Sequence, residues 1–134
     1  MNLFITGVFA FVGFAYSTSR ILPESYYKIK NAKQLKTTHR SLGINHFRVL
    51  LLFLFWGRKS NRRKYFNGTK SGLKNFVYQT KQSEFGHFAS FVTILFSSAY
   101  LLFFDYYLLV LFINLINIIG NLFPIILQRF HRMR

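Results

Sequence analysis

The positions of the basic residues constrain this chain more than any other feature. All 18 Lys and Arg residues lie between Arg20 and Lys81 or between Arg129 and Arg134, and the long apolar stretches outside those two segments contain none. Lys and Arg near membrane-spanning helices are retained on the cytoplasmic side of the membrane. The pattern therefore predicts an integral membrane protein with one basic, cytoplasmic face.

The composition agrees with a single membrane domain over residues 1–134. Hydrophobic residues make up 51% of the chain and aromatic residues 20%, which is more than an ordinary soluble domain of this size contains. The net charge of +15 adjoins apolar runs, so anionic lipid headgroups are the expected partners and nucleic acid is not. The absence of Cys excludes disulfides and thiolate chemistry.

Three apolar stretches predict transmembrane helices, at about residues 1–19, 86–104 and 106–128. The last two each suit a span of about 20 residues, and Asp105 between them predicts a tight turn on the side without basic residues. The first stretch could also be a cleavable signal peptide, but its positive charge follows the apolar core, which favours an uncleaved anchor. The expected fold is an all-α integral membrane protein with three spans, an external N-terminus and a cytoplasmic tail at 129–134.

The basic loop at residues 20–83 contains one ambiguous apolar run, Val49 to Trp56. Eight residues are less than half of a span, and a fourth crossing would place eight basic residues outside. We therefore expect an interfacial or re-entrant segment at about 47–56, and a buried segment packed on the hairpin is the alternative. This topology predicts a multi-pass protein of the bacterial cytoplasmic (inner) membrane.

Four amide side chains interrupt the third predicted span: Asn114, Asn117, Asn121 and Gln128. Their spacings of three, four and seven place them on one helical face. Amides that face lipid are costly, so this face must meet protein, water or a ligand. Interhelical hydrogen bonds, worth about 0.6 kcal/mol each on average, and a ligand site are both open interpretations.

Glu84 and His87 share a face of the second predicted span. A carboxylate three residues from an imidazole can orient the ring and raise its basicity, although such a pair is more often a surface ion pair or a cap. Counting back from Asp105 at about 1.5 Å per residue places His87 at the depth of Phe123, near the end of the third span. No second His follows one turn later, because Phe91 stands there, so we expect no zinc site.

Arg129 and Arg132 fall at the same predicted depth as Glu84 and His87. They could be snorkelling anchors or ligands for anionic groups. Pro124 removes a backbone donor at this level and frees a carbonyl group.

Four segments of the chain, spread over most of its length, resemble the glycosyl-4,4'-diaponeurosporenoate acyltransferase family. The segments are Ile21 to Tyr27, Leu42 to Arg48, Thr80 to Phe88 and Asn121 to Arg134. The last two are the most specific, because they combine Glu-x-x-His at a span entry with Asn-x-x-Pro-x-x-x-Gln-Arg at a span exit. The chain departs from the family pattern at Phe88, where the family usually has Trp, and at His131, where it usually has Asn.

The resemblance implies a membrane-bound acyltransferase that moves a fatty acyl group onto a hydroxyl of a glycosylated isoprenoid or other lipid at the cytoplasmic face. His87, steered by Glu84, would take the hydroxyl proton. Asn121 and Gln128 of the polar stripe would stabilise the oxyanion, and Arg129 and Arg132 would hold the donor's phosphates. No cofactor is expected beyond acyl-CoA or another acyl thioester as co-substrate, and Ser90 is a weak candidate nucleophile.

A non-enzymatic interpretation is also open. The chain could be a small membrane subunit or scaffold whose polar stripe meets a partner helix and whose basic loop binds anionic lipid. Three short spans enclose little volume, so we expect an oligomer or a larger membrane assembly under either interpretation.

Overall fold

The computed structural model describes residues 1–55 and 69–133, and among these residues every regular element is a helix. The elements are α1 (Asn2–Ala15), η1 (Thr18–Arg20), α2 (Glu24–Tyr27), α3 (Ala32–Ser41), α4 (Ile44–Phe55), α6 (Lys70–Tyr100), η2 (Leu101–Phe104), α7 (Tyr107–Asn117), η3 (Ile118–Leu122) and α8 (Phe123–Met133). Trp56, which ends the ambiguous apolar run, lies outside the described residues.

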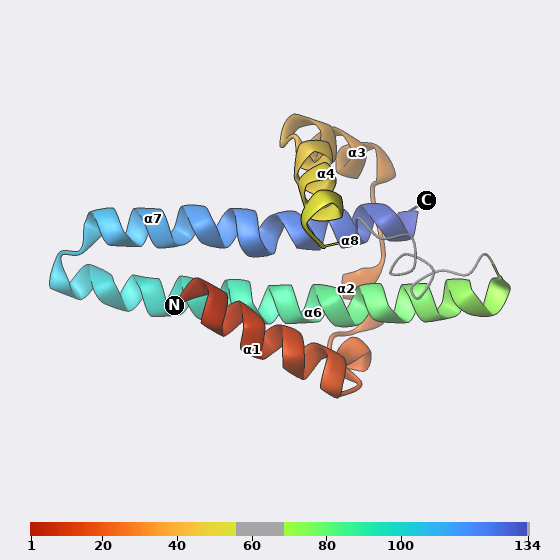
Figure 1. Ribbon diagram of the computed structural model, residues 1–134, viewed down its shortest axis with the longest axis horizontal. Helices are drawn as coiled ribbons and strands as arrows, with labels where there is room; N and C mark the ends of the chain where they lie inside the picture. Colours follow the sequence, from red (N-terminus) through yellow and green to blue (C-terminus); the bar gives the residue numbers. More distant parts are fainter. Residues whose placement is uncertain (56–68, 134) are drawn as a thin grey trace.

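A long helical hairpin forms the frame of the molecule (Figure 1). Helix α6 begins at the cap Thr69, whose side chain accepts a hydrogen bond from the Gly72 amide, and with η2 it runs antiparallel to α7, η3 and α8. The chain reverses at Asp105, whose φ of 60° lies in the left-handed region that Asp tolerates better than most residues. The predicted turn at Asp105 is therefore confirmed.

Both arms of the hairpin are long and apolar enough to cross a membrane. They cover Lys70–Phe104 and Tyr107–Met133, of 35 and 27 residues. The first arm, α6, begins at Lys70, 16 residues before the predicted start of the second span at 86, and this extension carries Lys70, Lys74 and Lys81. Helix α1 has 14 residues and is about 21 Å long, shorter than the roughly 30 Å of bilayer hydrocarbon, so a first span at 1–19 stays a prediction.

The distribution of side chains is inverted relative to a soluble protein. Large apolar side chains are highly exposed, including Leu3 at 88% and Phe103 at 84%, while Glu84, Asn117 and Asn121 are at most 1% exposed. In water such a large apolar surface would be unfavourable. In a bilayer the apolar surface faces lipid, and the polar groups are the ones that must be buried and paired. This pattern, together with the two long apolar helices, identifies a membrane protein.

Two glycines allow α1 to cross closely over α6. A Cβ atom at Gly86 would lie 3.0 Å from the backbone oxygen of Phe9, and one at Gly13 would lie 3.1 Å from the backbone oxygen of Gln82. Small residues at such crossings let helix backbones approach each other, which is a main source of packing energy between membrane helices.

Helices α3 and α4 pack beside α8, on the other side of the hairpin from α1 (Figure 1). The ring of His39 stacks on Phe130 with centroids 3.9 Å apart, and Ile44 is fully buried. Farther along α4, Val49 is 59% and Phe53 is 81% exposed. The start of α4 thus packs on the hairpin, and its exposed apolar continuation supports the interfacial interpretation of this segment.

The close crossing makes a paired prediction for two glycines. Gly86→Ala should destabilise the protein by about 1–3 kcal/mol, because the new methyl group must push α1 away from α6. Gly7→Ala, on α1 with no atom within 4 Å of the new Cβ, should be neutral or stabilising by about 0.5–1 kcal/mol. Denaturant titration of the purified protein in mild detergent measures both, and equal midpoints for the two variants would contradict the packing.

Candidate active site

A fully buried carboxylate links the two arms of the hairpin. Glu84 of α6 is 0% exposed, and each of its oxygens binds a different arginine of α8. Arg129 donates from Nε to Oε1 at 2.8 Å, and Arg132 donates from Nη2 to Oε2. A buried charge is tolerated only when it is paired and hydrogen-bonded, so this cluster ties α6 to α8 in one relative position.

The two arginines also hold the segment around α2 against the hairpin. The guanidinium of Arg129 lies 4.7 Å from the ring centroid of Tyr26, and that of Arg132 lies 5.5 Å from the ring centroid of Tyr27. Arg129 Nη2 also donates to the backbone oxygen of Tyr26 at 3.4 Å. Cation–π contacts strengthen when they are shielded from water, and Tyr27 is only 4% exposed.

Burial governs the titration of Tyr27. Burial of its ring, followed by the negative charge of Glu84, raises the pKa of Tyr27 to about 12. The hydroxyl therefore stays protonated at physiological pH, and Tyr27 serves as a neutral aromatic face for the neighbouring cations.

His87 lies one turn deeper along α6, where a second polar cluster joins three helices. Its Nδ1 atom is 3.1 Å from Oδ1 of Asn121 in η3. Asn121 also exchanges hydrogen bonds with the hydroxyl of Thr6 in α1, at 3.1 and 3.3 Å. Asn117 completes the cluster by accepting from Asn121 Nδ2 at 2.9 Å.

The direction of these hydrogen bonds fixes the tautomer of His87. Asn117 Nδ2 donates to the backbone oxygen of Phe91 at 3.1 Å, and because a carbonyl can only accept, the Asn117 oxygen must face Asn121. The Asn121 nitrogen therefore faces Asn117, and its oxygen faces His87. An amide oxygen cannot donate, so Nδ1 of His87 carries the hydrogen and Nε2 of the neutral ring carries the lone pair.

The pairing of Glu84 differs from the expected one. Glu84 turns to the arginines of α8, and the group that orients His87 is Asn121. The physical reason is charge: a buried carboxylate gains more from two guanidinium donors than from a neutral ring on its own helix. Asn121 donates one amide hydrogen to Thr6 and the other to Asn117. It therefore contacts His87 as an acceptor and has no amide hydrogen left to donate to an oxyanion.

The remaining members of the polar stripe connect α6 with the second arm. Asn114 donates to Ser98 at 2.9 Å, and Gln128 donates to Ser83 at 3.2 Å. Both contacts are interhelical hydrogen bonds, the simpler of the two sequence interpretations. The hydroxyl of Ser90 is fully buried and donates to the Gly86 oxygen at 2.7 Å, which makes it a poor nucleophile.

The helical backbone of the second arm is irregular around Asn121. Residues Ile118–Leu122 form a π-helical turn that ends two residues before Pro124. Pro124 has no N–H and cannot donate to the preceding turn, and π turns frequently occur at functional sites. The sequence indicated the freed carbonyl at Pro124 but not the π turn that carries Asn121.

Sequence reasoning missed three residues of these two clusters: Thr6, Tyr26 and Tyr27. Thr6 reaches Asn121 from α1, and the only sequence signal was its spacing of four from Asn2 within an otherwise apolar helix. Tyr26 and Tyr27 gave no signal of their own beyond their place in a family motif.

Among the described residues, no group of three or more His, Cys, Asp or Glu side chains could hold a metal ion.

These features define a small helical membrane protein with an ion cluster and an oriented histidine between its long helices. The family model of glycosyl-4,4'-diaponeurosporenoate acyltransferase matches residues 23–134, and the chain belongs to that family. The matched range includes His87, Asn121 and the whole ion cluster but not Thr6. No match was found among curated proteins or among solved structures.

The two carboxylates of this region should differ sharply in their effect on stability. Glu84→Gln should destabilise the protein by about 3–5 kcal/mol, because it leaves two arginines beside a neutral group in a buried site. Glu24→Gln removes the exposed partner of Lys81 and should cost less than about 1 kcal/mol. Thermal unfolding in detergent compares the two, and similar losses would show that the Glu84 cluster is not the tie between α6 and α8.

Proposed function

We propose that this protein transfers a fatty acyl group from an acyl thioester to a hydroxyl group of a glycosylated isoprenoid or another lipid. The observation that carries the proposal is the oriented His87, held with a free Nε2 lone pair by Asn121, in a chain of an acyltransferase family. The family match favours this activity over a purely scaffolding role.

The reaction needs one base and no covalent enzyme intermediate. His87 Nε2 accepts the proton of the lipid hydroxyl while the oxygen attacks the thioester carbonyl carbon. The tetrahedral intermediate then collapses, the carbon–sulfur bond breaks, and the leaving thiolate takes the proton back from His87. The products are an ester and a free thiol, so the atoms balance without any further reactant.

Asn121 and Asn117 act as positioning residues in this scheme. A ring that is free to rotate would present Nε2 to the substrate only part of the time, and the amide relay removes that freedom. The relay also stabilises the imidazolium that forms, because the Asn121 oxygen accepts from its Nδ1–H.

In this proposal the two substrates reach His87 from different surroundings, one from the cytoplasm and one from the bilayer. The charge pattern supports a bacterial cytoplasmic membrane location in which the basic loop and the tail face the cytoplasm. His87 lies near the basic end of the hairpin, one turn deeper than Glu84, so a soluble thioester arriving from the cytoplasm and a lipid-borne hydroxyl in the bilayer can both approach it. Acyl-CoA is the donor that we propose.

The test compares two histidines in cells that make a glycosylated carotenoid acid. His87→Ala should lower the amount of acylated product by about 100-fold to 10,000-fold, because the base is lost. His46→Ala, an exposed histidine on α4, should leave the product unchanged. Mass spectrometry of extracted pigments and glycolipids measures both, with the membrane level of each variant checked by immunoblot. Full acylation by the His87 variant would refute the proposed base.

A further inference from the structure

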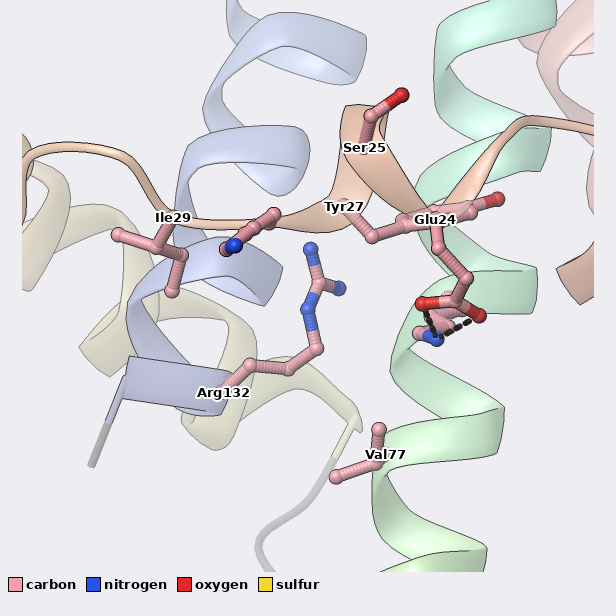
Figure 2. Close-up of a pocket in the computed structure, with 8 residues that line it drawn as sticks. Glu24, Ser25, Tyr27, Ile29, Val77 and Arg132 are labelled. Carbon is pink, nitrogen blue, oxygen red and sulfur yellow. Dashed lines mark hydrogen bonds and ion pairs between the residues drawn. The ribbon is translucent and has the colours of Figure 1, made fainter.

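A cationic pocket lies beneath the α2 segment, outside the histidine cluster (Figure 2). Its volume is about 550 Å³, and its walls include Tyr27, Lys28, Val77, Lys81 and Arg132. The α2 segment, residues 24–29, covers the pocket on one side, and α6 and α8 form its other walls. The exposed residues Ser25 and Lys28 lie at its rim.

The charges of the pocket do not balance. Three cations line it, Lys28, Lys81 and Arg132, and the lining holds a single carboxylate, that of Glu24. Both oxygens of Glu24 are taken by Lys81, at 2.6 and 2.7 Å, and Figure 2 shows this pair at one wall. Lys28 has no carboxylate partner in the lining, and Arg132 shares the single charge of Glu84 with Arg129, so the pocket keeps a net positive charge.

One of these cations has an unused donor. The side chain of Arg132 is 6% exposed, and its Nη2 atom binds Glu84. Its Nη1 atom is buried and has no hydrogen-bond partner among the described residues. Figure 2 shows the guanidinium of Arg132 pointing toward the segment between Tyr27 and Ile29. Buried polar atoms are nearly always paired in folded proteins, so an unpaired guanidinium nitrogen indicates a missing acceptor.

We propose that this pocket binds a phosphate group, which accepts from Nη1 of Arg132 and pairs with Lys28. Phosphate oxygens match guanidinium and ammonium donors in geometry and charge. The phosphate belongs either to the headgroup of an anionic lipid or to a soluble donor molecule. Where the source is the soluble donor, this inference rests on the proposed acyl transfer, but occupancy of the pocket is measured separately, without any reaction.

A neighbouring pocket supplies the control. It has a volume of about 510 Å³, lies along the same segment, and is lined by Lys28, Lys30 and Arg129 among others. Lys30 lines only this second pocket, whereas Lys28 lines both. Lys28 and Lys30 are both exposed, so Lys28→Ala and Lys30→Ala remove the same charge from nearly the same place. A general loss of positive potential would affect binding equally in the two variants.

The experiment uses the full chain in two kinds of nanodisc. In neutral phosphatidylcholine discs, calorimetry measures binding of inorganic pyrophosphate. In discs of phosphatidylcholine and phosphatidylglycerol in equal parts, native mass spectrometry measures the retained anionic lipid. If the source is a soluble donor, Lys28→Ala should weaken pyrophosphate binding about fivefold or more and Lys30→Ala less than twofold. If the source is a lipid headgroup, the same contrast should appear in retained phosphatidylglycerol.

Arg132→Lys serves as the second variant, because it keeps the charge but removes the fork that supplies Nη1. It should weaken the same probe as Lys28→Ala, in protein whose thermal unfolding confirms folding. Equal effects of Lys28→Ala and Lys30→Ala on both probes, a larger effect of Lys30→Ala, or no binding of either probe by the unaltered protein would overturn the proposal.

Discussion

The arrangement of this protein depends on the buried carboxylate of Glu84. Its two oxygens take one arginine each from α8, and the same arginines hold Tyr26 and Tyr27 of the α2 segment through their rings. A fully buried charge in a membrane protein is too costly to leave unpaired, so the three elements are locked in one arrangement. The position of α6 against α8 also fixes the depth at which His87 meets Asn121 and Ser83 meets Gln128.

The polar groups of the hairpin divide into two clusters with different chemistry. The ion cluster at Glu84 joins the α2 segment to the hairpin, and one of its arginines, Arg132, has an unpaired Nη1 atom and lines the adjacent pocket. The neutral cluster at His87 lies one turn deeper, where hydrogen-bond direction and not charge controls the chemistry. Because Glu84 is paired with the arginines, the ring of His87 is oriented by Asn121 and not by a carboxylate.

Local signals made much of this fold predictable. The apolar lengths and the turn expected at Asp105 predicted the hairpin, and counting residues from that turn placed Glu84, His87 and Asn121 at similar depths. What the sequence could not supply was the rotation of one helix about its axis relative to another. That rotation decides that Glu84 meets Arg129 and not His87, and that Thr6 of α1 reaches Asn121. The contacts of Tyr26 and Tyr27 depend on how the α2 segment crosses the hairpin, and the spacing of residues in the sequence does not predict that path.

The most direct test of this account is a double-mutant cycle on Glu84 and Arg132. The free energy of unfolding in detergent is measured for the unaltered protein, for Glu84→Gln, for Arg132→Gln and for the double variant. If the buried pair ties α6 to α8, the double variant should be less destabilised than the sum of the single variants, by about 1–3 kcal/mol. Additive losses would show that the two side chains act independently and would contradict the central role of Glu84.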